Sequence, residues 1–385
     1  MNTDKRRILV SDLQYDEDEV NAVTEVIRSQ WLTMGPRTDE FEKAVQKYIN
    51  VKHAVAVSNG TAALHLSLLA MGIGPGDEVI VTPLSFVAST NVVLYVGAKP
   101  VFVDVKADTF NIDPEKIKEK VTSKTRAIIP VHLAGLPADM DSIFEIAENH
   151  DIQVLEDAAH AIGAKYKGKK IGSFGDVTSF SFFSNKNLSV GEGGAITTNN
   201  DEIAKKLRLL RSHGLTKSTW ARHHKKEEES YDQLYEMVML GYNYRMTEIN
   251  AALGLVQLKK LDTFNAQRKK LFEFYMSLTN GLPLQFQQIP DDVESSYHVL
   301  PTLFPKGLRS RVRSELTDRG IGTSIHYTPI HKFQYYQNLG YRNELLPIAE
   351  DIGSRVITLP LHQNLSDNDV EYIVENIREV LDSLL

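Results

Sequence analysis

The sequence of 385 residues contains no cysteine. This absence excludes disulfide bridges, thiolate catalysis and cysteine-ligated zinc sites, and it fits a reducing compartment. Long apolar runs are also missing, since none approaches the roughly 18–20 residues that span a bilayer. The first residues, MNTDKRRILV, are basic but lack the apolar core of a signal peptide. We therefore expect a cytoplasmic protein that does not enter a membrane.

An excess of positive charge is lacking too. The chain has 43 Lys and Arg residues against 50 Asp and Glu residues, a formal net charge of −7. Surfaces that bind nucleic acid or anionic membranes are usually basic, so we expect neither partner. With 42% hydrophobic and 24% charged residues the composition is that of an ordinary globular protein, long enough for two domains.

Helical and extended patterns alternate between about residues 50 and 200. The segment SNGTAALHLSLLAMG has cap-type residues, apolar residues at helical spacing and a terminal glycine. Short β-branched runs precede and follow it: HAVAVS, DEVIVTP, KPVFVDV, RAIIPVHL, DIQVLED, DVTSFSFF and GGAITTN. Strands separated by helices predict an α/β domain with a mostly parallel sheet, in which ligands bind beyond the carboxyl ends of the strands.

The pattern changes after a polar stretch at residues 218–233. Residues 246–280 predict one long helix or two joined helices, with Ala251, Leu255 and Leu258 on one face. Beyond them, YHVLPTLF and GTSIHYTP are expected to form short strands, and the C-terminal residues an amphipathic helix.

Two domains are therefore predicted. The first, at 1–250, is a large α/β domain that holds the main ligand site. The second, at 251–385, is a smaller α+β domain that begins with the long linking helix.

Two tempting motifs have ordinary structural explanations. The segment MGIGPG at 71–76 resembles a glycine-rich nucleotide loop, but it follows a helix, so a helix end and a turn explain it. His223 and His224 could bind a metal, yet their charged neighbours, including the run at 225–229, indicate a solvated loop. We expect no metal site.

Lys186 stands where an apolar strand runs into a glycine-rich turn, in the segment SFFSNKNLSVGEGG. A buried ammonium group is costly, so a lysine here needs an explanation. Either it lies where the strand meets solvent, or it is desolvated with a lowered pKa, as in lysines that form Schiff bases. The residues around it leave both interpretations open.

Two motifs that follow predicted strands point to a ligand. In SNGTAAL, Asn59, Gly60 and Thr61 lead into a helix whose amides and hydroxyl could bind a phosphate, although an ordinary capped helix is the alternative. In TPLSFVAST, Phe86 could stack on a flat cofactor, although an aromatic residue there is more often part of the core.

A third motif, VLEDAAHAIGA, supplies carboxylates at a strand end. Asp157 or Glu156 could hold a protonated ring nitrogen, with His160 one turn onward, or either carboxylate could cap a helix. A phosphate cradle, a stacking ring, an anion and a lysine, each at a strand end, are together what pyridoxal phosphate requires.

The sequence resembles the DegT/DnrJ/EryC1/StrS family of sugar aminotransferases, which belong to the fold-type I enzymes that depend on pyridoxal phosphate. The resemblance covers nearly the whole chain and rests on segments in the family's order: WLTMGPRTDEFE, SNGTAALHL, TPLSFVASTNVV, VHLAGLPADM, EDAAHAIGA, SFFSNKNLSVGEGGA, RSHGL and GYNYRMTEINAALGLVQL. It implies a large α/β domain with a mostly parallel sheet and a smaller α+β domain.

The resemblance also implies how the phosphate is held. Gly60, Thr61 and Ala62 would bind it through backbone amides and a hydroxyl, and Ser181 would add a hydrogen bond. Asn243, in GYNYRM, would reach the phosphate of the neighbouring subunit. The family pattern is thus a homodimer with shared active sites.

For the cofactor ring, the resemblance implies four contacts. Lys186 would form the Schiff base, and Phe86 would stack on the ring. Asp157 would keep the ring nitrogen protonated. His160 would approach either the phenolic oxygen or the opposite ring face.

The sugar pocket is implied to include Thr33, Met34 and Gly35, together with His326 and His331. Which of these two histidines approaches the lysine is left open.

Family members with histidine at the lysine position are dehydratases, so the lysine in this chain favours transamination. The implied reaction takes the amino group from L-glutamate to a nucleotide-linked keto-deoxysugar, most simply at C4. The alternatives are a dehydratase on the same scaffold and a non-catalytic regulator that binds the cofactor; no appended DNA-binding segment supports the latter.

Overall fold

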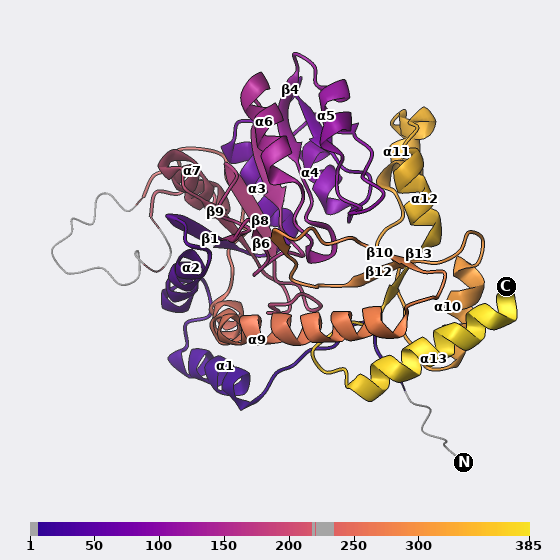
Figure 1. The fold of residues 1–385 in the computed structure, drawn as a ribbon. Helices are drawn as coiled ribbons and strands as arrows, with labels where there is room; N and C mark the ends of the chain where they lie inside the picture. The colour runs from indigo at the N-terminus through magenta and orange to yellow at the C-terminus, as the bar shows by residue number, and fades with distance from the viewer. Residues whose placement is uncertain (1–6, 218–219, 221–234) are drawn as a thin grey trace.

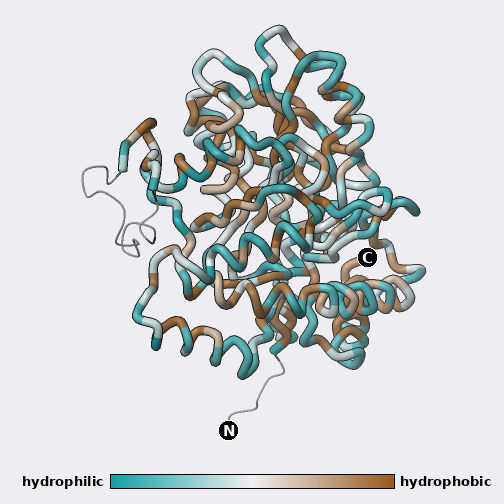
Figure 2. Tube along the Cα trace, turned by 90° about the vertical axis from the view of Figure 1, so that its left-hand side faces the viewer, coloured by the Kyte–Doolittle hydropathy of each residue, from teal (hydrophilic) through white to brown (hydrophobic). Residues whose placement is uncertain are grey.

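The computed structural model describes residues 7–217, 220 and 235–385 (Figure 1). The predicted polar loop with His223, His224 and the run at 225–229 lies outside the described residues, apart from one position. Within the described residues, no helix is both long and apolar enough to cross a membrane. Apolar stretches concentrate toward the middle of the trace, and hydrophilic stretches dominate its outer turns (Figure 2).

A seven-stranded sheet forms the centre of the molecule, in the order β1-β9-β8-β5-β4-β2-β3. Neighbouring strands from β8 to β3 are parallel, and β9 is antiparallel to both β1 and β8. The predicted α/β class with a mostly parallel sheet is confirmed. The strands are β1 His53–Val57, β2 Glu78–Val81, β3 Lys99–Phe102, β4 Thr125–Ile129, β5 Gln153–Asp157, β8 Val177–Ser181 and β9 Gly194–Thr198.

Side chains of a strand alternate between the two faces of the sheet, and in this sheet both faces are apolar. Helices therefore cover both of them. In β1, Val55 and Val57 pack in one core cluster and Ala54 and Ala56 in the other. Helices α3 (Gly60–Ala70), α4 (Ala88–Tyr95) and α7 (Asp201–Arg211) contribute to the first cluster. The second receives α2 (Pro36–Ile49), α5 (Pro114–Lys120), α6 (Met140–His150) and α9 (Glu248–Leu278). Helix α3 ends at the predicted turn, where Gly72 has a positive φ of 82°.

The predicted long helix is the single helix α9 of 31 residues. Thr247 caps it by accepting a hydrogen bond from the Asn250 amide. Ala251, Leu255 and Leu258 pack together against the core under the large sheet, as predicted. Helix α1 (Glu17–Ser29) and α2 pack against α9, and α13 (Asp367–Leu384) packs against it too (Figure 1).

The C-terminal part has its own antiparallel sheet, in the order β10-β12-β13. The strands are β10 Gln285–Phe286, β12 Leu300–Leu303 and β13 Val356–Leu359, and α10 (Arg309–Asp318) and α13 pack on them. A third small sheet joins β11 (Val293–Glu294) to β6 (Lys165–Tyr166) and β7 (Lys169–Lys170).

The prediction of a strand in GTSIHYTP is wrong. Only Ser324 pairs with β13, through two backbone hydrogen bonds with Thr358. The chain then leaves the small sheet: Pro329 has no amide to donate, and the Ile330 amide donates to the Pro83 carbonyl in a loop of the large sheet. YHVLPTLF does contain a strand, β12.

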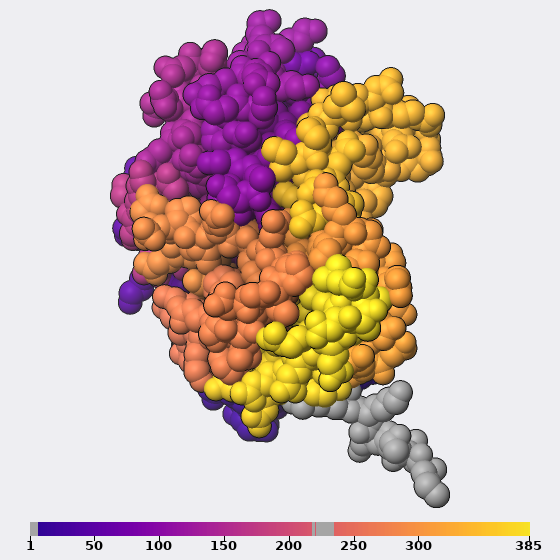
Figure 3. Space-filling view, turned by 45° about the vertical axis from the view of Figure 1, so that its right-hand side comes forward, coloured from indigo at the N-terminus to yellow at the C-terminus, as the bar shows by residue number. Residues whose placement is uncertain are grey.

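The segment beyond it, with α11 (Gln334–Asn338) and α12 (Pro347–Arg355), lies against the large sheet's outer edge (Figures 1 and 3). The Tyr341 hydroxyl donates to the Pro100 carbonyl at 2.6 Å, and Asp104 accepts from the Ile348 and Ala349 amides. Residues from both predicted domains therefore meet at this edge, and the division at 250/251 stays a prediction.

Candidate active site

A cavity of about 700 Å³ opens where β5 and β8 end and α3 begins. This is the place where ligands bind in sheets of this class. Nine of the predicted site residues line it: Gly60, Thr61, Ala62, Phe86, Asp157, His160, Ser181, Lys186 and His326. Residues from four separate strand ends and from the distant segment GTSIHYTP are thus brought together.

Lys186 follows β8 and lines the cavity rather than the outer surface. Burial lowers the pKa of its ammonium group to about 8, and the Asp157 carboxylate partly opposes this shift. An amine with this pKa has a much larger neutral fraction near physiological pH than an ordinary lysine, and the neutral form is the one that acts as a nucleophile or base. The placement favours the desolvated lysine over the lysine at the solvent boundary.

Asp157 is the last residue of β5 and is almost fully buried. Its Oδ2 accepts from the Ser89 hydroxyl at 2.6 Å, and its Oδ1 accepts from the Ala159 amide at 3.1 Å. Burial raises the pKa of this carboxyl, while both hydrogen bonds and Lys186 oppose the increase. The segment after Asp157 is a turn rather than a helix, so the alternative of a helix cap is wrong for this carboxylate.

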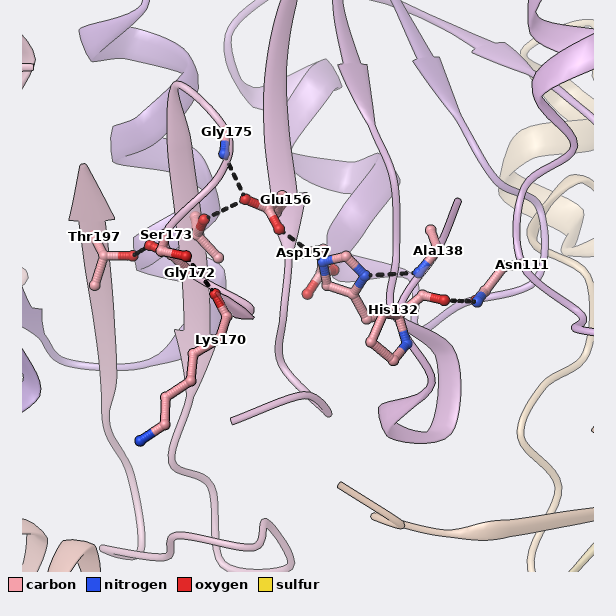
Figure 4. Close-up of polar contacts among 12 residues, drawn as sticks. Asn111, His132, Ala138, Glu156, Asp157, Lys170, Gly172, Ser173, Gly175 and Thr197 are labelled. Carbon is pink, nitrogen blue, oxygen red and sulfur yellow. Dashed lines mark hydrogen bonds and ion pairs between the residues drawn. The ribbon is translucent and has the colours of Figure 1, made fainter. Parts of the chain in front are cut away.

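Glu156 lies on the other face of β5 and does not line the cavity (Figure 4). Its Oε1 accepts from the Gly175 amide and the Thr178 hydroxyl, both at 2.8 Å. Its Oε2 lies 3.0 Å from His132 Nε2. Because His132 Nδ1 accepts from the Ala138 amide, Nε2 carries the proton and donates to the carboxylate. Glu156 is therefore neither a helix cap nor a ligand of the cavity.

His160 has a defined protonation pattern. Its Nδ1 accepts from the Ala134 amide at 3.2 Å, so its Nε2 carries the proton and donates to the Tyr327 oxygen at 3.1 Å. Burial, and then the charge of Lys186, lower the pKa of His160 well below its usual value. The neutral imidazole leaves the Tyr327 hydroxyl able to donate toward the cavity.

Phe86 is 59% exposed, so it is not the core residue that was the alternative interpretation. Its ring lines the cavity, 6.4 Å from the ring of Tyr327 between centroids.

The amino end of α3 is a capped helix, and its geometry is also compatible with a phosphate site, so both interpretations of SNGTAAL remain open. Asn59 caps the helix by accepting from the Ala62 amide at 2.8 Å, which leaves Ala62 engaged. Gly60 lies against Ser181: a Cβ added to it would be 2.7 Å from the Ser181 Cβ. Only glycine therefore lets the helix end, with its positive partial charge, approach the Ser181 hydroxyl this closely.

Of the two histidines that the resemblance suggested, His326 lines the lysine's cavity. Its Nδ1 lies 2.8 Å from the Thr358 hydroxyl, and burial lowers its pKa to about 4. His331 is fully buried elsewhere, with Nε2 3.2 Å from Glu350.

Four other predicted residues are described by the structure but do not line this cavity: Thr33, Met34, Gly35 and Asn243. The Gly35 amide donates to Glu248 of α9, and Met34 and Gly35 line a separate cavity. Asn243 pairs with Ser212 in an isolated bridge.

Three residues with direct contacts to the site were missed by sequence reasoning. Ser89 lies inside TPLSFVAST, which follows a predicted strand, and Tyr327 is next to His326, which the family resemblance named, so the sequence pointed near both. His298, whose Nε2 lies 3.5 Å from Lys186 Nζ, carries no signal in a single sequence.

The cavity's donor set fits pyridoxal phosphate. An anion is favoured where α3, Gly60 and Ser181 meet, and a buried carboxylate, Asp157, lines the same cavity for a protonated ring nitrogen. The Asn185 Oδ1 atom, also at the cavity, is buried without a hydrogen-bond partner among the described residues, which marks a place for a ligand donor. No group of three or more His, Asp or Glu side chains able to hold a metal ion occurs in the described ranges.

Comparisons with known proteins agree with this site. The model of the DegT/DnrJ/EryC1/StrS aminotransferase family matches residues 13–378. GDP-perosamine synthase from Caulobacter vibrioides is 41% identical over 386 residues, covering 98% of this chain and 100% of that protein. Spore coat polysaccharide biosynthesis protein SpsC from Bacillus subtilis is 41% identical over 379 residues, covering 95% of each.

Among solved structures, the PLP-form of the putative sugar aminotransferase Spr1654 from Streptococcus pneumoniae has a TM-score of 0.91 at 35% identity, covering 99% of this chain and 100% of that one. A PMP-form of the same protein matches equally well in fold. The predicted family, fold class and enzyme class are confirmed, and the predicted cofactor is the one these relatives were solved with.

Proposed function

We propose that this chain, which belongs to the DegT/DnrJ/EryC1/StrS aminotransferase family, uses pyridoxal phosphate to transfer an amino group from L-glutamate to C4 of a nucleotide-linked keto-deoxysugar. The observation that carries the proposal is one cavity that joins Lys186, the buried Asp157 carboxylate and the amino end of α3. Pyridoxal phosphate needs these three features: an amine for its aldehyde, an anion for its ring nitrogen and a binding site for its phosphate.

When bound, pyridoxal phosphate supplies an aldehyde and an electron-withdrawing ring that stabilises a carbanion. The chain's own residues supply its placement. Gly60, Thr61 and Ser181 would hold the phosphate, Phe86 would cover a ring face, and Asp157 would keep the ring nitrogen protonated. Ala62 would contribute its amide only if the Asn59 cap is released, because that cap already uses it.

Lys186 would move the proton of the donor's α-carbon. With a pKa near 8 its amine can accept a proton without holding it too tightly, which suits an acid and base that acts in both directions. Tyr327, aligned by His160, can donate a hydrogen bond to an oxygen that enters the cavity.

The sugar part of the proposal rests on relatives. One is named for a GDP-linked sugar product and another for spore coat polysaccharide biosynthesis, which supports a nucleotide-linked acceptor. The choice of C4 and of L-glutamate follows the family resemblance.

We also propose a homodimer with shared sites. Thr33, Met34, Gly35 and Asn243 do not line their own chain's cavity, although the resemblance gives them contacts with sugar or phosphate. Exposed aromatic rings also occur at the cavity, with Tyr95 57% exposed and Phe183 44% exposed, so a second copy has apolar surface to cover.

The test is a two-step turnover. The purified protein is loaded with pyridoxal phosphate and given L-glutamate, and release of 2-oxoglutarate is measured together with loss of the visible absorption band. Nucleotide-linked 4-keto and 3-keto deoxysugars are then supplied in parallel. Regain of the band with a 4-keto sugar is expected; regain only with 3-keto sugars would reject C4, and no response to any amino donor would reject the function.

A further inference from the structure

We propose that His298 is a positioning residue for Lys186: its Nε2 accepts a hydrogen bond from the lysine amine and so sets where that amine points. The two atoms are 3.5 Å apart, and they come from positions 112 residues apart in the chain. The catalytic consequence rests on the proposed function, whereas the contact itself does not.

The backbone of His298 is held on both sides. Its amide donates to the Ala134 carbonyl at 2.9 Å, and its carbonyl accepts from the Arg268 guanidinium of α9 at 3.1 Å. The residue is only 2% exposed and does not itself line the cavity, so it lies behind the lysine rather than beside the substrate. A held backbone and a buried ring give the side chain little freedom to move.

The hydrogen bonds of Asn187, the residue after the lysine, define which nitrogen of His298 carries the proton. The Asn187 Nδ2 atom donates to the Ser296 carbonyl and to Asn265 Oδ1, both at 2.7 Å. Asn265 in turn donates from its own Nδ2 to the Ile162 carbonyl, so its Oδ1 is an acceptor. Two carbonyl oxygens, which cannot donate, therefore fix the orientation of both amides.

With both Asn187 amide hydrogens engaged, its Oδ1 must accept, and His298 Nδ1, 2.9 Å away, must donate. A neutral imidazole with hydrogen on Nδ1 has a lone pair on Nε2. Nε2 is the nitrogen that faces Lys186 Nζ, so its lone pair is available to accept from the lysine amine. The chain of contacts from Ile162 to His298 thus leaves one unused acceptor, directed at the lysine.

The charges around His298 support the neutral form. Lys186, Arg268, His160 and His326 face it, and none is a carboxylate that would favour an imidazolium. Burial and then the Lys186 charge lower the pKa of His298 well below its usual value. An imidazolium would also place a second N–H against the lysine ammonium.

The consequence concerns the geometry of the amine. A free lysine side chain rotates about four bonds, so its nitrogen samples many positions. If one N–H of the neutral amine is held by Nε2, the nitrogen lone pair is turned away from His298 and toward the cavity. Lys186 remains the group that moves the proton, and His298 only orients it.

The first test measures the amine without any cofactor chemistry. Trace acetylation of the full-length, cofactor-free chain with acetic anhydride is followed across pH, and Lys186 labelling is quantified by mass spectrometry. An acceptor stabilises the ammonium form, so His298→Leu should lower the pKa of Lys186 by about one pH unit or more. His298→Gln, which keeps an acceptor oxygen near the Nε2 position, should restore most of that shift.

His362→Leu is the matched control. His362 is also buried and, like His298, lies outside the cavity lining, but its Nε2 is bonded to the Leu9 carbonyl rather than directed at Lys186. Its loss should leave the Lys186 titration unchanged. If His298→Leu does not fold, Asn187→Ala takes its place, because it releases Nδ1 and frees the ring to turn. An unchanged lysine pKa in whichever of these variants folds overturns the proposal.

The second test measures kinetics of the loaded enzyme. His298→Leu should lower kcat for the glutamate step by about tenfold or more, as expected for a misplaced base, with KM for glutamate little changed. His298→Gln should recover most of it. A Gln variant as slow as the Leu variant would mean that His298 carries protons itself, and would reject a positioning role. A shifted lysine pKa in a protein that transaminates nothing would reject the proposed function and leave the contact with Lys186 standing.

Discussion

Glu156 and Asp157 are adjacent buried carboxylates at the end of the same strand, yet their surroundings differ completely. Glu156 is fully buried on one face of β5, and its two oxygens share three hydrogen-bond donors: an amide, a hydroxyl and an imidazole N–H (Figure 4). Asp157 faces the cavity on the other side, with one hydroxyl and one amide donor and with Lys186 nearby. Strand alternation alone separates a carboxylate that supports the fold from one available to a ligand.

The largest effect on turnover is expected at Lys186, which lines the cavity that Asp157 faces. Lys186→Ala should abolish the visible absorption band and all turnover, because no other lysine among the described residues lines this cavity, while pyridoxal phosphate should still bind noncovalently. Absorption spectra and glutamate turnover measure this. Lys170→Ala is the matched control, since Lys170 also has its pKa lowered by burial but packs on the Tyr48 ring away from the cavity. Parent-rate transamination by Lys186→Ala would refute the assignment.

Asp157→Asn should come next. The amide keeps the size of the side chain and can still accept from Ser89, but it removes the negative charge that would hold the ring nitrogen protonated. We expect a loss of about 10²-fold or more in kcat, because a developing carbanion loses electrostatic stabilisation. Single-turnover kinetics with glutamate measure it. A normal rate would reduce Asp157 to a structural role like that of its neighbour.

A third experiment extends the comparison to a second chain. An Asn243→Ala chain, once shown to be strongly impaired alone, is mixed with a Lys186→Ala chain under conditions of subunit exchange. If Asn243 serves the partner's site, a mixed dimer has one intact site and one with both lesions. Recovery of up to about a quarter of the parent activity is then expected, because random exchange makes half the dimers mixed.

The control for this mixture pairs Lys186→Ala with Asp157→Asn, two lesions that belong to the same chain's cavity. Each site of that mixed dimer keeps one lesion, so no recovery is expected. Absence of recovery with Asn243→Ala, despite demonstrated exchange, would end the shared-site proposal.

The smallest effect on turnover is expected from Glu156→Gln. Both Glu156 oxygens accept from donors, Oε1 from the Gly175 amide and the Thr178 hydroxyl and Oε2 from His132, so either orientation of a glutamine places its NH2 group against a donor. This should reduce the free energy of unfolding by about 1–3 kcal/mol, the cost of an unsatisfied buried donor. Urea unfolding measures that loss, and glutamate turnover at a permissive temperature should stay near the parent value. A large loss of turnover with normal stability would contradict the division between the two carboxylates.

Much of this arrangement could be predicted from the sequence because it depends on local patterns. The strands of the large sheet and α9 follow from apolar periodicity, and Lys186 and Asp157 stand at strand ends, where ligand groups gather. Even so, the sequence could not assign roles to Glu156 and Asp157, since that depends on which face of β5 each side chain occupies.

The contacts that were missed are long-range. His298 meets Lys186 only because the chain between them folds back through α9, and no local pattern marks a histidine for that contact. The failed strand in GTSIHYTP has the same origin: its residues alternate acceptably, but hydrogen bonds to a loop of the other sheet decide its path.

Helix α9 also constrains how this chain can change in length. Near its start, Glu248 accepts from the Gly35 and Thr38 amides, and farther along, Asn265 and Arg268 hold Asn187 and His298. Glu248 and Asn265 are separated by about 25 Å of helix at 1.5 Å per residue, and one inserted residue would turn one end relative to the other by about 100°. An insertion between them would thus misalign either the Gly35 loop or the lysine support. We expect sequences with this site to vary in their loops while the residue count between these two anchors stays fixed.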